Sequence, residues 1–180
     1  MIVWILPLFR QFKSGIFYYF LILAIEDPLG FILYSLFNID PVFIHSILAI
    51  SLYFSIDFNL EELLKNRIAN TIIIIGCLIA LFTLSNLFIL ILIGHFLVLS
   101  KFVKHIILRL HGSGEMNIFY LVMTFYELTI LVNIIGIVGG SYIGITLHYT
   151  TLAFQILIAI FCTIFRIDNK KLIIKLKPAT

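Results

Sequence analysis

Long apolar runs, separated by short polar or turn-forming stretches, repeat along the whole chain. A helix that crosses a bilayer needs about 20 predominantly apolar residues, and each of these runs approaches that length. The pattern predicts an all-α integral membrane protein, a six-transmembrane-helix bundle with spans near residues 14–37, 41–58, 68–84, 87–100, 117–138 and 142–165. We expect residues 1–180 to form a single polytopic transmembrane domain with no soluble domain.

The division between the third and fourth spans depends on a turn, because residues 68–100 contain no Asp, Glu, Lys or Arg. As one helix this stretch would measure roughly 50 Å at about 1.5 Å per residue, whereas the apolar core of a bilayer is about 30 Å thick. Ser85 and Asn86 are residue types that favour turns. The sequence therefore predicts a tight turn at this point.

The basic residues fall on one side of this arrangement. All 12 Lys and Arg lie in four segments, the N-terminal segment and residues 59–67, 101–116 and 166–180. Basic residues in short loops mark the cytoplasmic face of a membrane protein. We therefore expect both termini to be cytoplasmic, with outward turns around residues 38–40, 85–86 and 139–141, and a location in the bacterial inner (plasma) membrane.

Composition agrees with a membrane protein and limits the partners. Hydrophobic residues make up 62% of the chain and charged residues 12%, whereas about a quarter of a soluble domain is charged. The net charge of +3 resides at the ends of apolar runs, which argues against nucleic acid as a partner. The expected partners are the lipid bilayer and either another membrane protein or a second copy of the chain. Cys77 and Cys162 lie at different predicted depths, so we expect no disulfide between them.

Two Asp-Pro pairs predict local structure. Asp40-Pro41 should open the second span, because Asp is a good helix N-cap and Pro suits the first helical position. Asp27-Pro28 falls inside the first span, where proline removes a backbone donor, so the helix should kink there or break into two half-helices. The apolar segment before Arg10 should lie at the inner interface, with Trp4 as its anchor.

Polar side chains inside the spans are the candidates for a functional site. An ionisable group there costs about 2.5–3.5 kcal/mol on insertion scales, so such groups usually face the bundle interior or a wet cavity. We expect Glu127 and His148 in particular to point away from lipid, into the bundle or into a contact with a partner chain. The candidates for binding a ligand or an ion are Glu26, Asp27, His95, Tyr120, Thr124, Glu127, His148 and Gln155.

Three helix faces carry regular polar or small residues. Asn117, Tyr120, Thr124 and Glu127 follow one another at helical spacing on the fifth span. On the sixth span Ser141, His148, Gln155 and Cys162 recur every seven residues. The third span carries a similar stripe of small residues, Ala69, Gly76, Ala80 and Thr83. Such stripes pack helices closely, and the first two are also consistent with an ion, proton or ligand site. For the third span we expect packing alone.

Several of these residues resemble motifs of the CAAX-processing and bacteriocin-processing intramembrane proteases. The similarity covers Glu61-Glu62 with Arg67, then His95, then Gly140-Ser141 with His148. The resemblance implies one of the paired glutamates as a base, assisted by both histidines. Here four residues separate Glu62 from Arg67 where that family has three, and two further positions depart from its motifs: Ile91 stands in place of phenylalanine, and Leu152 in place of asparagine.

The sequence does not indicate a particular cofactor. It is consistent with three classes of function. The first is a non-enzymatic subunit or module of a membrane complex, for transport, channel function or sensing, that acts through a polar intramembrane interior. The second is a divergent protease of the family above. The third is an electron-transfer subunit with a haem between His95 and His148, and a metal held by Glu26, Glu127 and these histidines is a related alternative.

Overall fold

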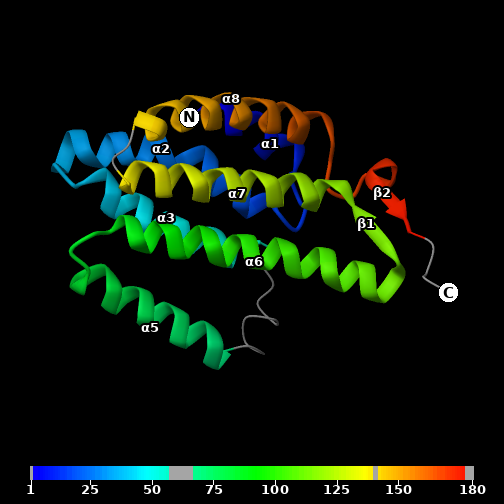
Figure 1. Cartoon of the computed structure of the whole chain (residues 1–180), viewed down its shortest axis with the longest axis horizontal. Coiled ribbons are helices and arrows are strands. Elements are labelled where there is room, and N and C mark those ends of the chain that lie inside the picture. The colour runs from blue at the N-terminus through cyan, green and yellow to red at the C-terminus, as the bar shows by residue number, and fades with distance from the viewer. Residues whose placement is uncertain (1, 57–66, 140–141, 177–180) are drawn as a thin grey trace.

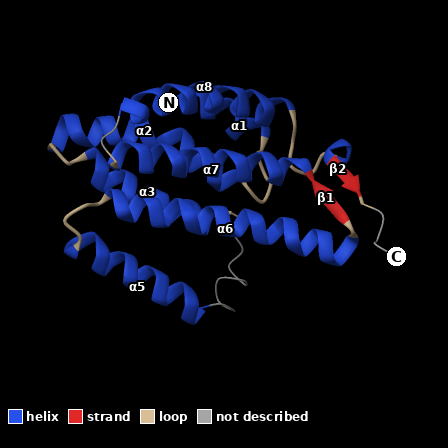
Figure 2. Ribbon diagram, in the orientation of Figure 1, coloured by secondary structure: helices blue, strands red, loops and turns tan. Residues whose placement is uncertain are grey.

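The computed structural model describes residues 2–56, 67–139 and 142–176, and these residues are mostly helical (Figure 1). In the described part of the chain the α-helices are α1 (Ile5–Arg10), α2 (Phe17–Phe37), α3 (Pro41–Ser55), α5 (Arg67–Thr83), α6 (Phe88–Ser113), α7 (Ile118–Val138) and α8 (Tyr142–Ile164). A 3₁₀ turn, η1 (Ile2–Trp4), precedes α1, and a second, η2 (Lys170–Leu172), follows α8. Two short strands, β1 (Glu115–Asn117) and β2 (Ile173–Lys175), pair antiparallel and stand out in red in Figure 2.

Three of these helices, α2, α6 and α7, are long and apolar enough to cross a membrane. The helix α3, the helix α5 and the segment His148–Ile164 of α8 are shorter apolar stretches. The chain is therefore a helical protein with three candidate membrane spans among its described residues. The helix bounds follow the predicted spans closely, except that α6 does not end near residue 100.

Side-chain caps form where the sequence predicts turns. Asp40 is the N-cap of α3, its carboxylate accepts a hydrogen bond of 2.8 Å from the backbone N–H of Val42, and Pro41 takes the first helical position. Between α5 and α6 the side-chain oxygen of Asn86 accepts a hydrogen bond of 3.0 Å from the N–H of Phe88. Both predictions are confirmed, because a short polar side chain supplies the acceptor that a free helix start requires.

Six helices close into a ring around one apolar core. Going round the ring, α1 packs on α2, α2 on α3, α3 on α6, α6 on α7, α7 on α8, and α8 returns to α1. The helix α5 lies outside this ring, at the bottom of Figure 1, and has no buried residue among those described. The Ala69–Thr83 stripe has no buried member, and nothing lies within 4 Å of where a Cβ on Gly76 would be, so packing through this stripe stays a prediction that would need another chain.

The N-terminal segment is part of the core. Trp4 is only 3% exposed and packs against Phe20 and Tyr126, with ring centroids 5.8 and 5.1 Å apart. The prediction of an interfacial anchor is thus wrong for this residue. The physical reason is that α1 fills a gap between α2 and α8 that the large indole ring helps to close.

Two further expectations are corrected along the helices. The helix α2 is continuous from Phe17 to Phe37 with Pro28 inside it, so the predicted division into two half-helices is wrong, whereas a bend there stays a prediction. Proline frees only one carbonyl from its helical bond, and neighbouring helices can tolerate this. The helix α6 continues past Lys101, whose ammonium group donates to the carbonyls of Tyr53 and Ile56 at the end of α3. It ends only at Gly114, which has a left-handed φ of 64°.

One end of the bundle, called the strand end below, gathers segments from three parts of the chain. The strands β1 and β2 pair there, with Met116 opposite Ile174. Asn117 donates to the carbonyl of Ile167, and Gln11 bonds to the end of α8. The opposite end, which carries the α2–α3 and α5–α6 turns, is called the turn end (Figure 1).

Candidate functional site

Glu127 is a fully buried carboxylate, 0% exposed, that joins three helices. One carboxylate oxygen accepts a hydrogen bond from the hydroxyl of Tyr19 on α2. The other lies 2.8 Å from Nδ1 of His95 on α6. A buried carboxylate is tolerated when its oxygens are hydrogen-bonded, and here both are. The expectation that Glu127 points away from lipid is confirmed in that it is fully buried.

The close approach of α3 and α6 fixes His95 in place. Its neighbour Gly94 lies against Ala49, so near that a Cβ at position 94 would come within 2.8 Å of the Ala49 carbonyl carbon. Small residues at a crossing allow two helix backbones to approach closely. The glycine therefore holds α6 against α3, and the adjacent histidine is directed toward α7.

A second carboxylate–histidine pair lies nearer the turn end. Glu26 of α2 and His45 of α3 are joined by a contact of 2.7 Å between Oε1 and Nδ1, and their side chains are 17% and 29% exposed. This pair is thus less enclosed than Glu127 and His95, whose side chains are 0% and 8% exposed. Pairing explains how two ionisable groups are accommodated on helix faces that are otherwise apolar.

Glu26, His45 and His95 border one cavity of about 280 Å³ in the bundle. Its polar wall consists of Glu26, Asp27, His45, His95, Asn133 and Gln155. The apolar wall includes Trp4, Leu23, Phe88 and several residues of α7. The side-chain oxygen of Asn133 is buried and has no hydrogen-bond partner among the described residues. A cavity with this lining has both the room and the polar groups that ordered water or a polar ligand requires.

The N-terminal segment bounds the cavity on one side, through Trp4. Gln11 lies beside the end of α8, and Trp4 stands seven residues earlier, about 10 Å further into the bundle at 1.5 Å per residue. Trp4 lines the cavity at this point and forms its floor.

Large apolar side chains fill the bundle between this floor and the strand end. Tyr19, Phe20, Phe102, Phe119 and Met123 are all 0% exposed there. The ring of Tyr19 packs edge-on against Phe20 and Phe102, with centroids 5.5 Å away in each case. The cavity is therefore closed toward the strand end by packed rings, and Glu127 sits at the boundary between the polar and apolar parts.

The structure separates the predicted site residues into groups. Glu26, Asp27, His95 and Gln155 line the cavity, and Glu127 stands behind His95. Tyr120 and Thr124 are buried with Glu127 and Asn117, as their spacing predicts, but are not among the residues that line the cavity. The ring of Tyr120 instead stacks on His105, 5.1 Å between centroids, and the hydroxyl of Thr124 donates back to the carbonyl of Tyr120.

His148 does not lie in the interior. It is exposed, so it does not face into the bundle of this chain, whereas a contact with a partner chain stays a prediction. The polar stripe of α8 turns inward only further along, since Gln155 is half-buried and Cys162 is fully buried. Ser141, the first member of the stripe, lies outside the described residues. Both cysteines are free, as predicted.

The haem, metal and protease alternatives each depend on where the structure places their residues. His95 is buried and bonded to Glu127, whereas His148 is exposed and does not line the cavity, so the two are not brought to one haem site. Among the described residues no group of three or more His, Cys, Asp or Glu lies close enough to hold a metal ion. The paired glutamates of the protease resemblance, Glu61 and Glu62, lie outside the described residues.

Sequence reasoning missed four contributors to the site, namely Tyr19, His45, Asn133 and Trp4. His45 carried a usable signal, because it is an ionisable residue within a predicted span. Tyr19 carried none, since a tyrosine near a helix start is ordinarily an interfacial residue. Its role depends on the contact between α2 and α7, which the local sequence does not encode.

Comparison with known proteins identifies no relative. The chain matches no protein-family model, no curated protein and no solved structure. The candidate site therefore rests on its own geometry.

Proposed function

We propose that the chain is a multi-pass membrane module, a non-enzymatic subunit for transport, channel function or sensing, that works by exchanging a proton in its polar cavity. It has six spans in a bacterial inner membrane, with the strand end in the cytoplasm. Two observations support this orientation. The basic residues cluster in the segments near the strand end, and β1–β2 pairing together with the Gln11 bonds ties three of these segments to that end.

The observation that carries the proposal is the bond between His95 and Glu127. A carboxylate accepts the Nδ1 hydrogen of the ring, which leaves Nε2 as the acceptor of a neutral imidazole. Because His95 lines the cavity, Nε2 can take a proton from water there, and Glu127 stabilises the resulting imidazolium. Histidine is the side chain that changes charge most readily near neutral pH. The tyrosine hydroxyl on the other carboxylate oxygen fixes the orientation of Glu127.

The second pair extends this arrangement across the cavity. Glu26 and His45 lie on α2 and α3, and His95 lies on α6, so proton-exchanging groups border the same space from three helices. A volume of about 280 Å³ holds several water molecules, each of which occupies about 30 Å³ in the liquid. Water in the cavity thus provides the connection between the two pairs.

The packed rings on the other side give the site a direction. Tyr19, Phe102 and Phe119 separate Glu127 from the strand end, so a proton reaches His95 from the turn end in this conformation. A transporter or sensor needs a site with access from one side at a time. The arrangement corresponds to the state that is open toward the periplasm.

Proton flux into liposomes that contain the purified chain tests the proposal. The matched substitutions are His95→Gln in the cavity and His148→Gln on the exposed surface, because both remove an imidazole from a helix and only the first touches Glu127. With an imposed potential and a trapped pH-sensitive dye, we expect His95→Gln to lower flux by about a hundredfold or more, the lower range for loss of a proton-transferring group. We expect His148→Gln to retain it.

Equal loss in the two variants would contradict the proposal, as would a wild-type flux no greater than that of empty liposomes. Circular dichroism and elution volume in detergent provide the control for folding. A change in flux is attributed to His95 only when these two measurements match the wild type.

A further inference from the structure

A basic hollow of about 610 Å³ lies at the strand end, apart from the polar cavity. It is lined by Phe9, Arg10, Phe12, Lys13, Thr163 and Arg166. Three of these six residues are cationic and none is acidic. Residues of the N-terminal segment and residues at the end of α8 form the hollow together. Its basic side chains are far apart in the sequence and become neighbours only when the chain folds.

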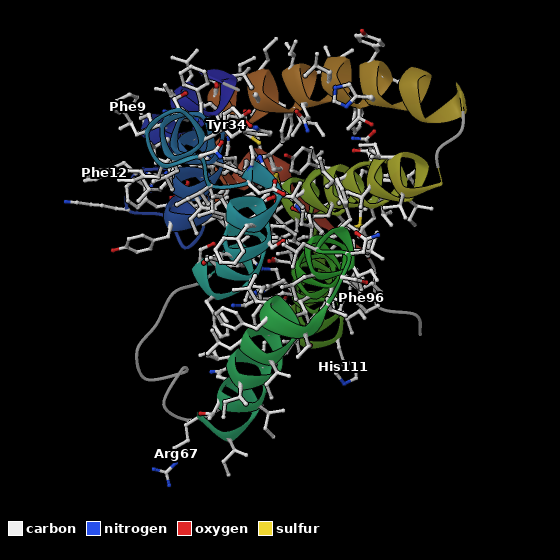
Figure 3. All side chains as sticks on the ribbon, turned by 90° about the vertical axis from the view of Figure 1, so that its left-hand side faces the viewer. Phe9, Phe12, Tyr34, Arg67, Phe96 and His111 are labelled. Carbon is white, nitrogen blue, oxygen red and sulfur yellow. The ribbon has the colours of Figure 1, made fainter. Side chains whose placement is uncertain are left out.

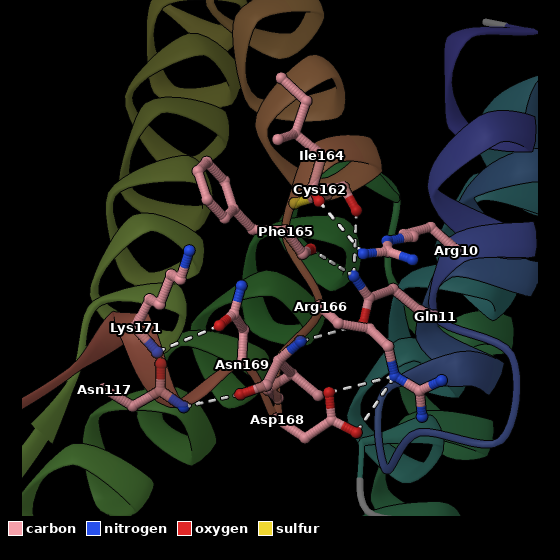
Figure 4. Close-up of polar contacts among 11 residues, drawn as sticks. Arg10, Gln11, Asn117, Cys162, Ile164, Phe165, Arg166, Asp168, Asn169 and Lys171 are labelled. Carbon is pink, nitrogen blue, oxygen red and sulfur yellow. Dashed lines mark hydrogen bonds and ion pairs between the residues drawn. The ribbon is translucent and has the colours of Figure 1, made fainter.

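Gln11 builds this junction. Its side chain is 0% exposed and donates to the carbonyls of Cys162 and Phe165, 3.0 and 2.8 Å away, while its oxygen accepts from the N–H of Ile167 (Figure 4). These bonds hold Arg10 and Arg166 on either side of the same hollow. The site is therefore supported by buried hydrogen bonds and does not depend on the chance approach of surface side chains.

The charges leave a positive excess in the hollow. Arg166 is paired with Asp168, with its Nε 3.1 Å from both carboxylate oxygens, and Arg10 donates weakly to the carbonyl of Ile164 at 3.4 Å. Lys13 is exposed and forms no ion pair with the described residues, and its ammonium lies 5.7 Å from the ring of Phe12. Counting Arg10, Lys13 and Arg166 against Asp168 gives three positive charges and one negative charge, which favours an anion.

Aromatic side chains flank the same hollow. Phe9 is 72% exposed and Phe12 is 55% exposed, and Figure 3 shows both on the same side of the bundle, pointing away from it. A free anion gains nothing from exposed rings, whereas a lipid places its phosphate among basic groups and its acyl chains beside apolar ones. The combination distinguishes a lipid from a soluble phosphate.

We propose that this hollow binds the phosphate headgroup of an anionic phospholipid from the cytoplasmic leaflet. The proposal rests on the membrane orientation proposed above but not on proton exchange in the cavity. Arg10 and Lys13 contact the phosphate, Arg166 supports it from the end of α8, and Phe9 and Phe12 lie along the acyl chains. Because the headgroup bridges the N-terminal segment and α8, the lipid reinforces the junction that positions Trp4 beneath the cavity.

Native mass spectrometry of the full chain in mild detergent tests this site, with phosphatidylglycerol or phosphatidylcholine added. The informative variant is Lys13→Asn, because Lys13 has a left-handed φ of 62° and asparagine tolerates that backbone better than other uncharged side chains except glycine. The matched control is Lys170→Asn, which removes an exposed lysine of η2 outside the hollow. We expect the wild type to bind phosphatidylglycerol. The affinity of Lys13→Asn for this lipid should be about fivefold lower, and that of Lys170→Asn should stay within about twofold of the wild type.

Three results would overturn the proposal. One is equal binding of the two lipids, and another is an equal loss in the two lysine variants, which would indicate a general positive field. The third is displacement of phosphatidylglycerol by excess inorganic phosphate, which would assign the hollow to a soluble anion. Unchanged lipid binding in His95→Gln separates this site from the proton site, so that either proposal can fail alone.

Discussion

Replacing Gly94 by alanine should push α6 away from α3. The added Cβ would lie 2.8 Å from both the carbonyl carbon and the Cβ of Ala49, whereas ordinary contacts of this kind begin near 3.4 Å. The helices must therefore separate by about 0.6 Å, the difference between these two distances. Overpacking of this size typically costs about 1–3 kcal/mol. Because His95 follows directly on α6, the shift also strains its bond to Glu127.

Gly76→Ala is the matched control, since no atom lies within 4 Å of the added Cβ on α5. Both substitutions gain the same helix propensity, up to about 1 kcal/mol, so this term cancels when the two variants are compared. At about 2–4 °C per kcal/mol for a chain of this length, we expect Gly94→Ala to unfold on the order of 5 °C below Gly76→Ala in detergent. Adding Ala49→Gly should restore only part of the loss, because the carbonyl carbon remains in the way. Equal unfolding temperatures for Gly94→Ala and Gly76→Ala would refute the reasoning.

Two other predictions concern topology and the strand end. In a cysteine-free background, a membrane-impermeant thiol reagent added from outside should label a cysteine placed at Ser141 but not one placed at Ser113, and the reverse pattern would invert the six-span arrangement. Gln11→Leu removes three hydrogen bonds and leaves the N–H of Ile167 without its acceptor, so thermal unfolding in detergent should show a loss of about 2–4 kcal/mol. An unfolding temperature equal to that of the wild type would show that the N-terminal segment is not held by these bonds.

Helix positions could be predicted from the sequence because their causes are local. The apolar runs set the helix lengths, Asp40 caps α3, and the side chain of Asn86 accepts from the backbone at the start of α6, at the turns where the hydrophobic pattern alone is ambiguous. The spacing of Tyr120, Thr124 and Glu127 is local as well, since a helix places residues three and four apart on one face. All three are buried as that spacing predicts.

The arrangement of the helices could not be predicted in the same way. In a membrane both the lipid-facing and the core-facing sides of a helix are apolar, so hydrophobicity does not tell them apart. For this reason the sequence does not show that α5 lies outside the ring and that the short α1 takes a place within it. Whether Trp4 and His148 are buried or exposed depends on the helices that pack beside them, and not on the residue types themselves.

The candidate site shows the same division. Glu127 is recognisable because an ionised group deep in a span needs partners. Its actual partners, Tyr19 and His95, come from two other helices, and their selection depends on how α2 and α6 meet α7. A single sequence identifies the residue that needs a partner, whereas the fold identifies the partner.

The most direct test of the account is whether the buried Glu127–His95 pair exchanges a proton with water. Infrared difference spectra of the protein in lipid nanodiscs, recorded between two external pH values, report the carboxyl and imidazole groups that change protonation. The account predicts a pH-dependent carboxyl or imidazole band that disappears in Glu127→Gln, which keeps the shape and loses the charge, and persists in His148→Gln. Identical difference spectra for the wild type and Glu127→Gln would contradict it, because Glu127 and His95 would then be a purely structural pair.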